Sequence, residues 1–207
     1  MRQIISFANH KGGVAKTTSV SSLGVALSKM GKRVLLVDLD PQTNLTDILT
    51  KETRDRTLYD SLRDLRDLPL IQIREGLDLC PSSIDLVSMD MELGDQPDRD
   101  QRLSKLLRPL DYDYILLDCP PGLGVLTINA LSASDKVVIP LTPEALPAKG
   151  LGTLLNIIDL VRTRSNPDLE LEPRPPTRRS PYNPVQPQKD KQTCRGDSPG
   201  VFRRSGI

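Results

Sequence analysis

A glycine-containing loop joins the first apolar run of the chain to its first predicted helix. The residues "ANHKGGVAKTTS" occupy positions 8–19 and lead into a helical pattern that begins at Lys16. The usual phosphate-binding loop has the pattern G-x-x-x-x-G-K-[ST]. With Lys16 as the lysine of that pattern, its two glycines fall on His10 and Ala15, and an additional lysine is present at Lys11. The loop therefore predicts an anion site at a helix start, with two departures from the usual pattern.

Short apolar runs alternate with helical patterns along most of the chain. This alternation predicts a doubly wound, mainly parallel α/β sheet with flanking helices and right-handed crossovers. In the first helix we expect one buried face formed by Leu23, Ala26, Leu27 and Met30, because these residues recur at helical spacing, and we expect Gly31 to end that helix. Strands are predicted at 4–8, 33–40, 76–83, 112–118 and 136–142, and helices at 16–30, 44–69, 84–94, 99–108, 125–134 and 147–163.

Three carboxylates lie at the ends of predicted strands. Asp38 and Asp40 close the run "RVLLVDLD", and Asp118 closes the run "YDYILLD". Because ligands of such sheets bind beyond the carboxyl ends of the strands, we expect these three residues and the glycine loop to meet in one crevice. There Lys16 would reach the β- and γ-phosphates, the Thr17 hydroxyl would bind Mg²⁺, and Asp118 would hold the metal through water. The alternative for an aspartate at a strand end is a helix cap.

Three segments carry a family resemblance. "KGGVAKTT", "VDLDPQTN" and "ILLDCPPG" follow one another in an order and spacing that resemble the ParA/Soj partition ATPases, which belong to the deviant Walker A group of P-loop ATPases. The resemblance extends from residue 2 to about residue 171. It implies ATP and Mg²⁺ as cofactors and an ATP-dependent homodimer with two nucleotides at its interface. The nucleotide-binding residues expected in the loop are Gly12, Gly13, Val14, Ala15, Lys16, Thr17 and Thr18.

The resemblance also suggests roles for residues around the phosphates. Lys11 would reach across the dimer to the partner's phosphates, as an arginine finger supplied in trans does; a simple electrostatic contact is the alternative. Asp40 would position or activate the attacking water, while Asp38 would support the lysine and the metal. The backbone N–H of Gly122 lies where it would sense the γ-phosphate, so we expect residues 118–124 to form a nucleotide-dependent switch.

Ala15 departs from the family pattern, in which this position is usually glycine. Glycine tolerates a positive φ at little cost, whereas alanine does not. If φ is positive here, the added methyl group strains the loop by about 1 kcal/mol. We expect nucleotide binding to survive this change.

The function implied by the resemblance is DNA partition. The chain would hydrolyse ATP, bind double-stranded DNA nonspecifically as an ATP dimer, and segregate a plasmid or chromosome with a ParB-type centromere-binding partner. It would be cytoplasmic, associated with the nucleoid when ATP is bound, and without membrane contact. Two alternatives remain open: a truncated, inactive remnant of such an ATPase, and a MinD-like ATPase for division-site placement. The MinD-like alternative requires a C-terminal amphipathic helix, which the Pro-rich tail does not predict.

The composition changes at about residue 172. The 207 residues carry a net charge of +1, but residues 173–207 hold eight Arg or Lys and two Asp, so this tail carries +6 and the remainder −5. The tail also has seven prolines and no apolar period, which predicts disorder. We therefore expect an incomplete P-loop ATPase domain over residues 1–171, followed by a Pro/Arg-rich tail over 172–207. A reading-frame change is one hypothesis for the tail, which the coding DNA tests.

Overall fold

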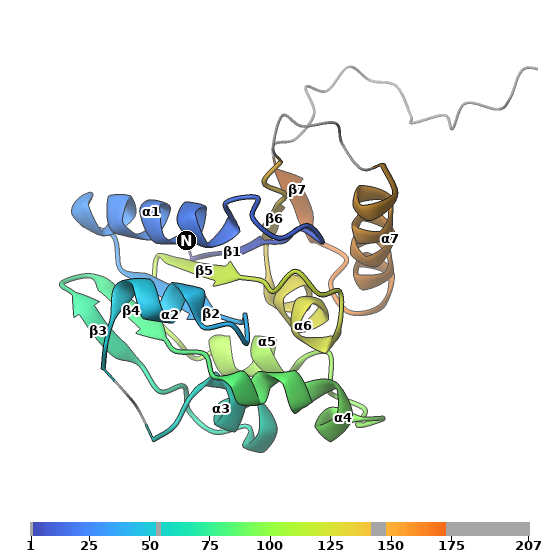
Figure 1. Ribbon diagram of the computed structural model, residues 1–207, viewed down its shortest axis with the longest axis horizontal. Coiled ribbons are helices and arrows are strands. Elements are labelled where there is room, and N and C mark those ends of the chain that lie inside the picture. Colours follow the sequence, from blue (N-terminus) through green and yellow to red (C-terminus); the bar gives the residue numbers. More distant parts are fainter. Residues whose placement is uncertain (1, 53–54, 142–147, 173–207) are drawn as a thin grey trace, which may run out of the picture. The chain divides into compact units, whose positions relative to one another are not determined.

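The computed structural model describes residues 2–52, 55–141 and 148–172. Its strands form one seven-stranded sheet with the order β3-β4-β2-β5-β1-β6-β7 (Figure 1). Neighbouring strands are parallel except for the pair β3–β4, which is antiparallel. The predicted α/β sheet is therefore confirmed. The strands are β1 (Gln3–Phe7), β2 (Val34–Asp38), β3 (Ile71–Arg74), β4 (Leu77–Cys80), β5 (Tyr114–Asp118), β6 (Lys136–Val138) and β7 (Glu170–Glu172).

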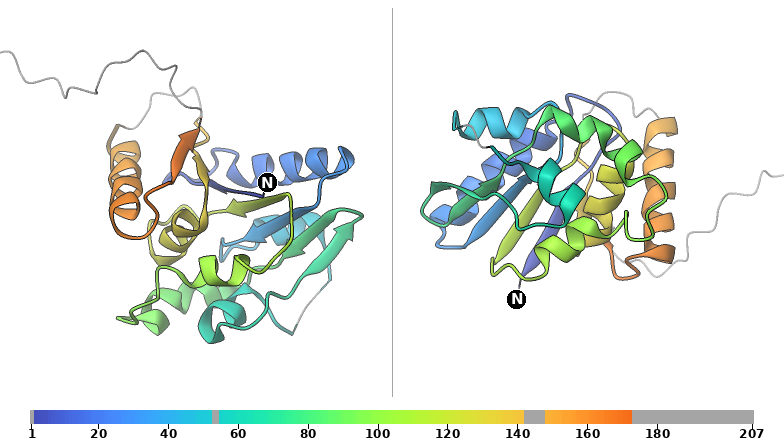
Figure 2. Two further views of the ribbon diagram at one scale, coloured as in Figure 1. Left: turned by 180° about the vertical axis from the view of Figure 1, so that it is seen from behind. Right: turned by 90° about the horizontal axis from the view of Figure 1, so that it is seen from below.

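Helices cover both faces of the sheet. The first two pack over one face, in a core with Phe7 and Leu36, and the remaining helices pack over the other face (Figure 2). Successive apolar side chains of the central strands enter the two cores in turn, because successive residues of a strand point to opposite faces. The helices are α1 (Lys16–Lys29), α2 (Asn44–Leu49), α3 (Leu58–Asp64), the 3₁₀ helix η1 (Ile84–Ser88), α4 (Met89–Leu93), α5 (Arg102–Leu107), α6 (Val125–Ala133) and α7 (Ala148–Arg164).

The buried face of α1 differs from the predicted one. Leu23 and Met30 are 37% and 72% exposed, whereas Val20 and Gly24 are buried. A Cβ atom added to Gly24 would lie 2.7 Å from Leu36 of the sheet, so α1 approaches the sheet closely through small residues. The close contact at Gly24 places a small residue at the centre of this face, while the predicted Leu27 packs partly buried against the core. Gly31 ends α1 as predicted, with φ of +76°.

Some bounds differ from the prediction, and two strands were not predicted. The predicted helix at 44–69 is divided, because α2 ends at Leu49 and α3 begins only at Leu58. A capping box formed by Thr57 and Asp60 starts α3. Strand β3 was not predicted, although its sequence "IQIR" precedes a tight turn at Gly76, where φ is +73°. The short strand β7 was also not predicted.

The described residues all fall within one compact unit that spans Met1–Pro175. Within them, no helix combines the length and the hydrophobicity that crossing a bilayer requires. The predicted tail lies outside the described residues, apart from Glu172 at the end of β7. The division into domains at residues 171 and 172 therefore stays a prediction.

Candidate nucleotide site

The glycine loop follows β1 and ends where α1 begins. Gly13 has φ of +70°, and Ala15, at the N-cap of α1, has φ of +63°. The carbonyl of Ala15 accepts the first helical bond from the Ser19 backbone N–H, at 2.9 Å. Alanine at position 15 therefore adopts the left-handed conformation that glycine adopts without strain. The backbone N–H groups at the start of α1 have no side-chain cap, which leaves them available to an anion.

The side chain of Lys16 curls back into the loop. It is only 6% exposed, and its Nζ donates to the backbone carbonyls of Asn9 and Lys11, each at 3.4 Å. The Asn9 side chain fixes the same turn, because its Oδ1 accepts from the Lys11 N–H at 2.9 Å and its Nδ2 donates to the Pro140 carbonyl at 2.7 Å. The loop thus places one ammonium group at its centre, held by weak contacts that a phosphate oxygen would replace.

Asp38 and Asp118 lie side by side at the ends of β2 and β5. Both are fully buried. The carboxylate of Asp38 is well bonded: it accepts from the Thr46 hydroxyl at 2.7 Å, from the Thr46 N–H at 2.9 Å and from the Asp40 N–H at 3.1 Å. Burial raises the pKa of Asp38 to about 6, and these hydrogen bonds limit the increase. No hydrogen bond joins Asp38 to Lys16, so its expected support of that lysine is indirect at most.

Asp118 is the exception among the buried carboxylates. Neither of its oxygens has a hydrogen-bond partner among the described residues. Burial raises its pKa to about 7, the Thr17 hydroxyl and the Lys16 charge oppose this increase, and the Asp38 charge adds to it. Thr17 is close enough to influence the pKa, although its geometry falls short of a hydrogen bond. A buried acceptor without a hydrogen-bond partner is costly, so these two oxygens are suited to accept from a donor that a ligand supplies.

Asp40 lies just beyond β2 and is 8% exposed. Its Oδ1 accepts from the Gln42 N–H at 3.0 Å, and its backbone carbonyl accepts from the Ser82 hydroxyl at 2.7 Å. The Ser82 N–H in turn donates to the Thr46 hydroxyl at 3.1 Å. Thr46 and Ser82 therefore fix Asp38 at the end of β2 and Asp40 just beyond it. The sequence reasoning missed both residues, because a single serine or threonine carries no distinctive pattern.

The remaining predicted residues surround this centre. Val14 is buried, Thr17 is half-buried, and Thr18 and Lys11 are exposed. Gly122, in the segment after β5, is also exposed, and its carbonyl accepts from the Thr127 hydroxyl at 2.6 Å. The structure thus brings the loop, Asp38, Asp40 and Asp118 to one edge of the sheet, with residues 118–124 beside them, as the parallel topology predicts.

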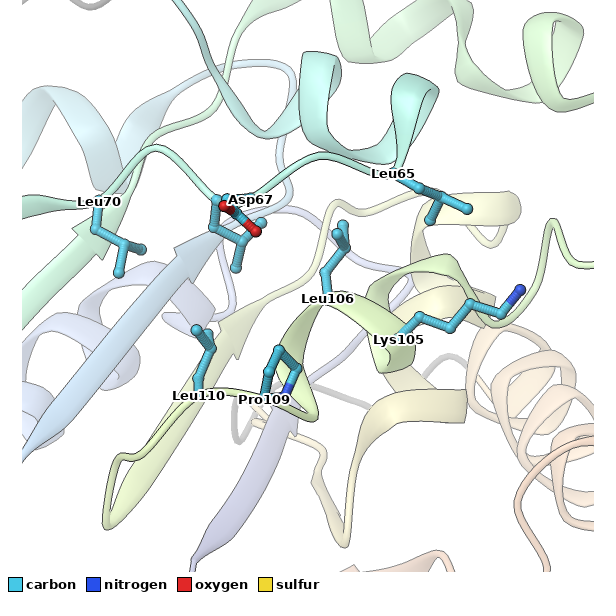
Figure 3. A pocket seen from close by; sticks show the side chains of 8 residues that line it. Leu65, Asp67, Leu70, Lys105, Leu106, Pro109 and Leu110 are labelled. Atoms are coloured by element: carbon cyan, nitrogen blue, oxygen red, sulfur yellow. The ribbon is translucent and has the colours of Figure 1, made fainter.

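A hollow away from these residues lies between α5 and the segment that joins α3 to β3. It encloses about 380 Å³ and is lined mainly by leucines. Figure 3 shows Leu70, Leu106 and Leu110 facing this space, whereas the side chain of Lys105 extends away from it. Such a lining suits apolar groups and offers little to a triphosphate. None of the predicted site residues lines this hollow. The candidate site is therefore the group formed by the glycine loop, Asp38, Asp40 and Asp118 at the strand ends.

Comparison with known proteins identifies the family of the chain. The AAA domain family matches residues 2–171. The sporulation initiation inhibitor protein Soj of Bacillus subtilis is 46% identical over 179 residues, which cover 83% of this chain and 71% of Soj. The chromosome partitioning protein ParA of Myxococcus xanthus is 42% identical over 179 residues, which cover 82% of this chain and 62% of ParA. The chain therefore spans between three fifths and three quarters of the length of these two relatives.

A solved structure resembles the whole described fold. The crystal structure of cobyrinic acid a,c-diamide synthase from Mycobacterium smegmatis, with a bound ATP analogue and magnesium, has a TM-score of 0.79 at 41% identity. The similarity covers 83% of this chain and 72% of that one. Matches of this identity and coverage show the family and the fold. The chain belongs to the AAA domain family and, within it, to the ParA/Soj-type P-loop ATPases.

Proposed function

We propose that the chain binds ATP with Mg²⁺ at the loop after β1 and hydrolyses it to drive DNA partition. The observation that carries this proposal is the placement of the Lys16 ammonium and the unpartnered Asp118 carboxylate at adjacent strand ends. Relatives at 42–46% identity include a chromosome partitioning protein, and a structural neighbour holds an ATP analogue and magnesium. Both facts support a nucleotide at this edge of the sheet.

The residues present fit a magnesium ion. Mg²⁺ keeps several waters and binds through one or two protein oxygens together with substrate phosphates. The Thr17 hydroxyl would supply a direct oxygen, and Asp118 would accept from a metal-bound water, which would satisfy its buried oxygens. When bound, the ion neutralises charge on the β- and γ-phosphates. The described residues offer no cluster of three or more His, Cys, Asp or Glu for a metal.

The two lysines of the loop suit different roles. Lys16 is buried inside the loop, where it would contact the β- and γ-phosphates of the nucleotide bound by its own subunit. Lys11 is exposed on the loop, where it would reach the phosphates of a second subunit in an ATP-dependent homodimer. A positive charge from the partner would stabilise negative charge on the transferred phosphoryl group. Nucleotide binding, dimerisation and turnover would then depend on one another.

Asp40 suits the orientation of the attacking water. Its backbone is fixed on one side by the Ser82 hydroxyl and on the other by Asp38. Its Oδ1 accepts from Gln42, which holds the carboxylate in one orientation at the mouth of the site. Its role would be geometric, as for water-positioning residues in phosphoryl transfer.

We extend the proposal to the cellular role of such an ATPase. The ATP dimer would bind double-stranded DNA nonspecifically in the cytoplasm, at the nucleoid, and a ParB-type partner would trigger hydrolysis. The alternative is an inactive remnant of a partition ATPase, which would not hydrolyse ATP.

Turnover and dimerisation together test this proposal. ATP hydrolysis would be measured with and without double-stranded DNA, and the dimer would be followed by light scattering. We expect Lys16→Ala to abolish both dimer and turnover, and Asp40→Ala to keep the dimer but lower turnover by about 100-fold. Lys11→Ala should reduce dimerisation and turnover. Lys29→Ala, at the far end of α1, serves as the matched control. A wild-type chain that binds ATP without hydrolysing it would favour the remnant.

A further inference from the structure

Helix α6 begins directly after residues 118–124 and has an unusual N-terminus. Its N-cap residue is Gly124, which has no side chain to accept a hydrogen bond, and no acidic residue lies in its first turn. Helix starts expose backbone N–H groups and a partial positive charge, which an N-cap side chain or a nearby carboxylate usually compensates. For α6, that compensation comes from another element of the fold.

The compensating group is Asp90 of α4. Its Oδ1 accepts from the Val125 N–H at 3.0 Å. A Cβ atom added to Gly124 would lie 2.6 Å from Asp90 Oδ2 and 3.3 Å from the other two carboxylate atoms. The backbone of Gly124 has φ of −84°, which any residue adopts without strain. Glycine is therefore needed at this position for the approach of Asp90 and not for its backbone conformation.

The segment that carries Asp90 also reaches the other side of the candidate site. Ser82, near its start, donates to the Asp40 carbonyl at 2.7 Å. Between these two contacts, the segment is anchored by Leu86 and Met89, which are 1% and 0% exposed. Residues 82–90 thus connect the loop after β2 to the start of α6. At that start, the Thr127 hydroxyl also holds the Gly122 carbonyl, so the end of segment 118–124 is tied down by the same helix.

We propose that Asp90 is a positioning residue for nucleotide discrimination: by capping α6 through space, it fixes residues 118–124 where Gly122 meets the γ-phosphate. This inference rests on the proposed function and adds a residue to it. The effect should appear selectively with ATP, because ADP lacks the phosphate that Gly122 would contact. A cap with a merely structural role would stabilise the fold equally whether ATP or ADP is bound.

The first test compares the affinities for two nucleotides. The dissociation constants of Mg·ADP and of a non-hydrolysable Mg·ATP analogue would be measured by calorimetry for the wild type, Asp90→Ala and Asp90→Asn. We expect Asp90→Ala to lower the preference for the ATP analogue over ADP by about fivefold, the size of effect typical of a lost cap, and Asp90→Asn to have a smaller effect. Asp95→Asn, an exposed aspartate beyond α4, is the charge-matched control.

A double-mutant cycle tests the contact itself. In the wild-type background, Gly124→Ala places a methyl group against the Asp90 carboxylate and should lower both the melting temperature and the ATP preference. In the Asp90→Ala background, the same methyl group finds space, so Gly124→Ala should add little. Additive effects would overturn the assigned contact. Gly124→Ala and Asp90→Asn also keep the test decisive if Asp90→Ala fails to fold.

The outcomes separate this inference from the function it rests on. If the wild type binds neither nucleotide, the proposed function fails and the inference fails with it. If the wild type prefers the ATP analogue and Asp90→Ala lowers stability but keeps the same preference, Asp90 is only a structural cap. In that case the proposed function stands without the inference.

Discussion

Ala15 introduces backbone strain into the loop of the candidate nucleotide site. Its φ of +63° lies in the left-handed region, which costs a non-glycine residue roughly 1–2 kcal/mol. The neighbouring Gly13, at +70°, carries no such cost. Since the Ala15 side chain is exposed, its methyl group contributes little packing in return. The loop keeps its shape because α1 and the Asn9 contacts determine it.

This cost can be measured by substitution. Ala15→Gly removes the strain of the folded loop, which raises stability, but it also raises the conformational entropy of the unfolded chain, which lowers stability by about 0.4–1 kcal/mol. We therefore expect the free energy of unfolding to rise by about 0.5 kcal/mol. The control Ala26→Gly, at an exposed position inside α1, should lower it by about 1 kcal/mol. Urea denaturation of both variants gives the comparison. Two losses of equal size would show that Ala15 is not strained.

The Asp118 carboxylate makes stability depend on pH. Its folded pKa of about 7 lies above the ordinary value near 3.8, so the folded state binds more protons than the unfolded state between those values. In the metal-free and nucleotide-free protein, the stability contributed by protonated Asp118 should be present at low pH and lost as the pH rises through 7. Asp118→Asn should reduce the fall in unfolding free energy between pH 5.5 and 8. An unchanged slope would show that Asp118 titrates normally.

Not every residue of the site was predictable from the sequence. Lys16, Asp40 and Asp118 follow strands in recognisable motifs, so their convergence followed from the parallel topology. Thr46, Ser82 and Asp90 act through hydrogen bonds to residues of other elements. Nothing in their local sequence records those contacts, and only the folded chain brings the partners together.

At the scale of elements, the C-terminus of α3 depends on a buried cation. Arg102 of α5 is 7% exposed, and its Nη1 donates to the carbonyls of Leu62 and Arg63 at 2.8 and 2.7 Å. These carbonyls belong to the last turn of α3, where no intrahelical donor is available. Asp98 lies 3.4 Å away and balances the charge. The guanidinium therefore joins α3 to α5.

Removing that guanidinium should weaken the contact between α3 and α5 and lower the free energy of unfolding. Arg102→Met keeps the apolar stem but leaves the Leu62 and Arg63 carbonyls without this donor and removes one of the two cations beside Asp98, so we expect the free energy of unfolding to fall by about 3 kcal/mol. Lys105→Ala, on the same helix, removes a half-exposed ion pair with Asp98 and should change it by less than about 1 kcal/mol. Chemical denaturation distinguishes the two. Similar losses would mean that Arg102 acts only as a surface charge.

The helices also show where sequence periodicity fails. The buried face of α1 shifts from Leu23 and Met30 to Val20 and Gly24, whereas Leu27 packs partly against the core as expected. The prediction of one helix over 44–69 did not use a helix-start pattern present in the sequence, the capping box of Thr57 and Asp60 at the start of α3. Local apolar spacing therefore identified the helices better than it identified their packing or their bounds.

At the scale of the whole molecule, the buried strands were the most predictable part. The runs that became β2 and β5 are apolar up to their terminal aspartates, and β1 is apolar apart from Gln3 and Ser6, because both faces of the central sheet are covered by helices. The edge strands β3 and β7 are short and partly polar, so they lack that signal. The central strands are also the ones that carry the candidate site, which explains why its position could be predicted although the sheet edges could not.

The most direct test of the central claim is the affinity for Mg·ATP. Titration calorimetry would compare the wild type with Lys16→Ala and with the control Lys29→Ala on the same helix. Lys16→Ala removes the ammonium at the centre of the loop and should weaken binding by at least about tenfold, as expected for a lost hydrogen bond to a charged group, while Lys29→Ala should bind as the wild type does. Equal affinities for the wild type and Lys16→Ala would contradict a nucleotide site at this loop.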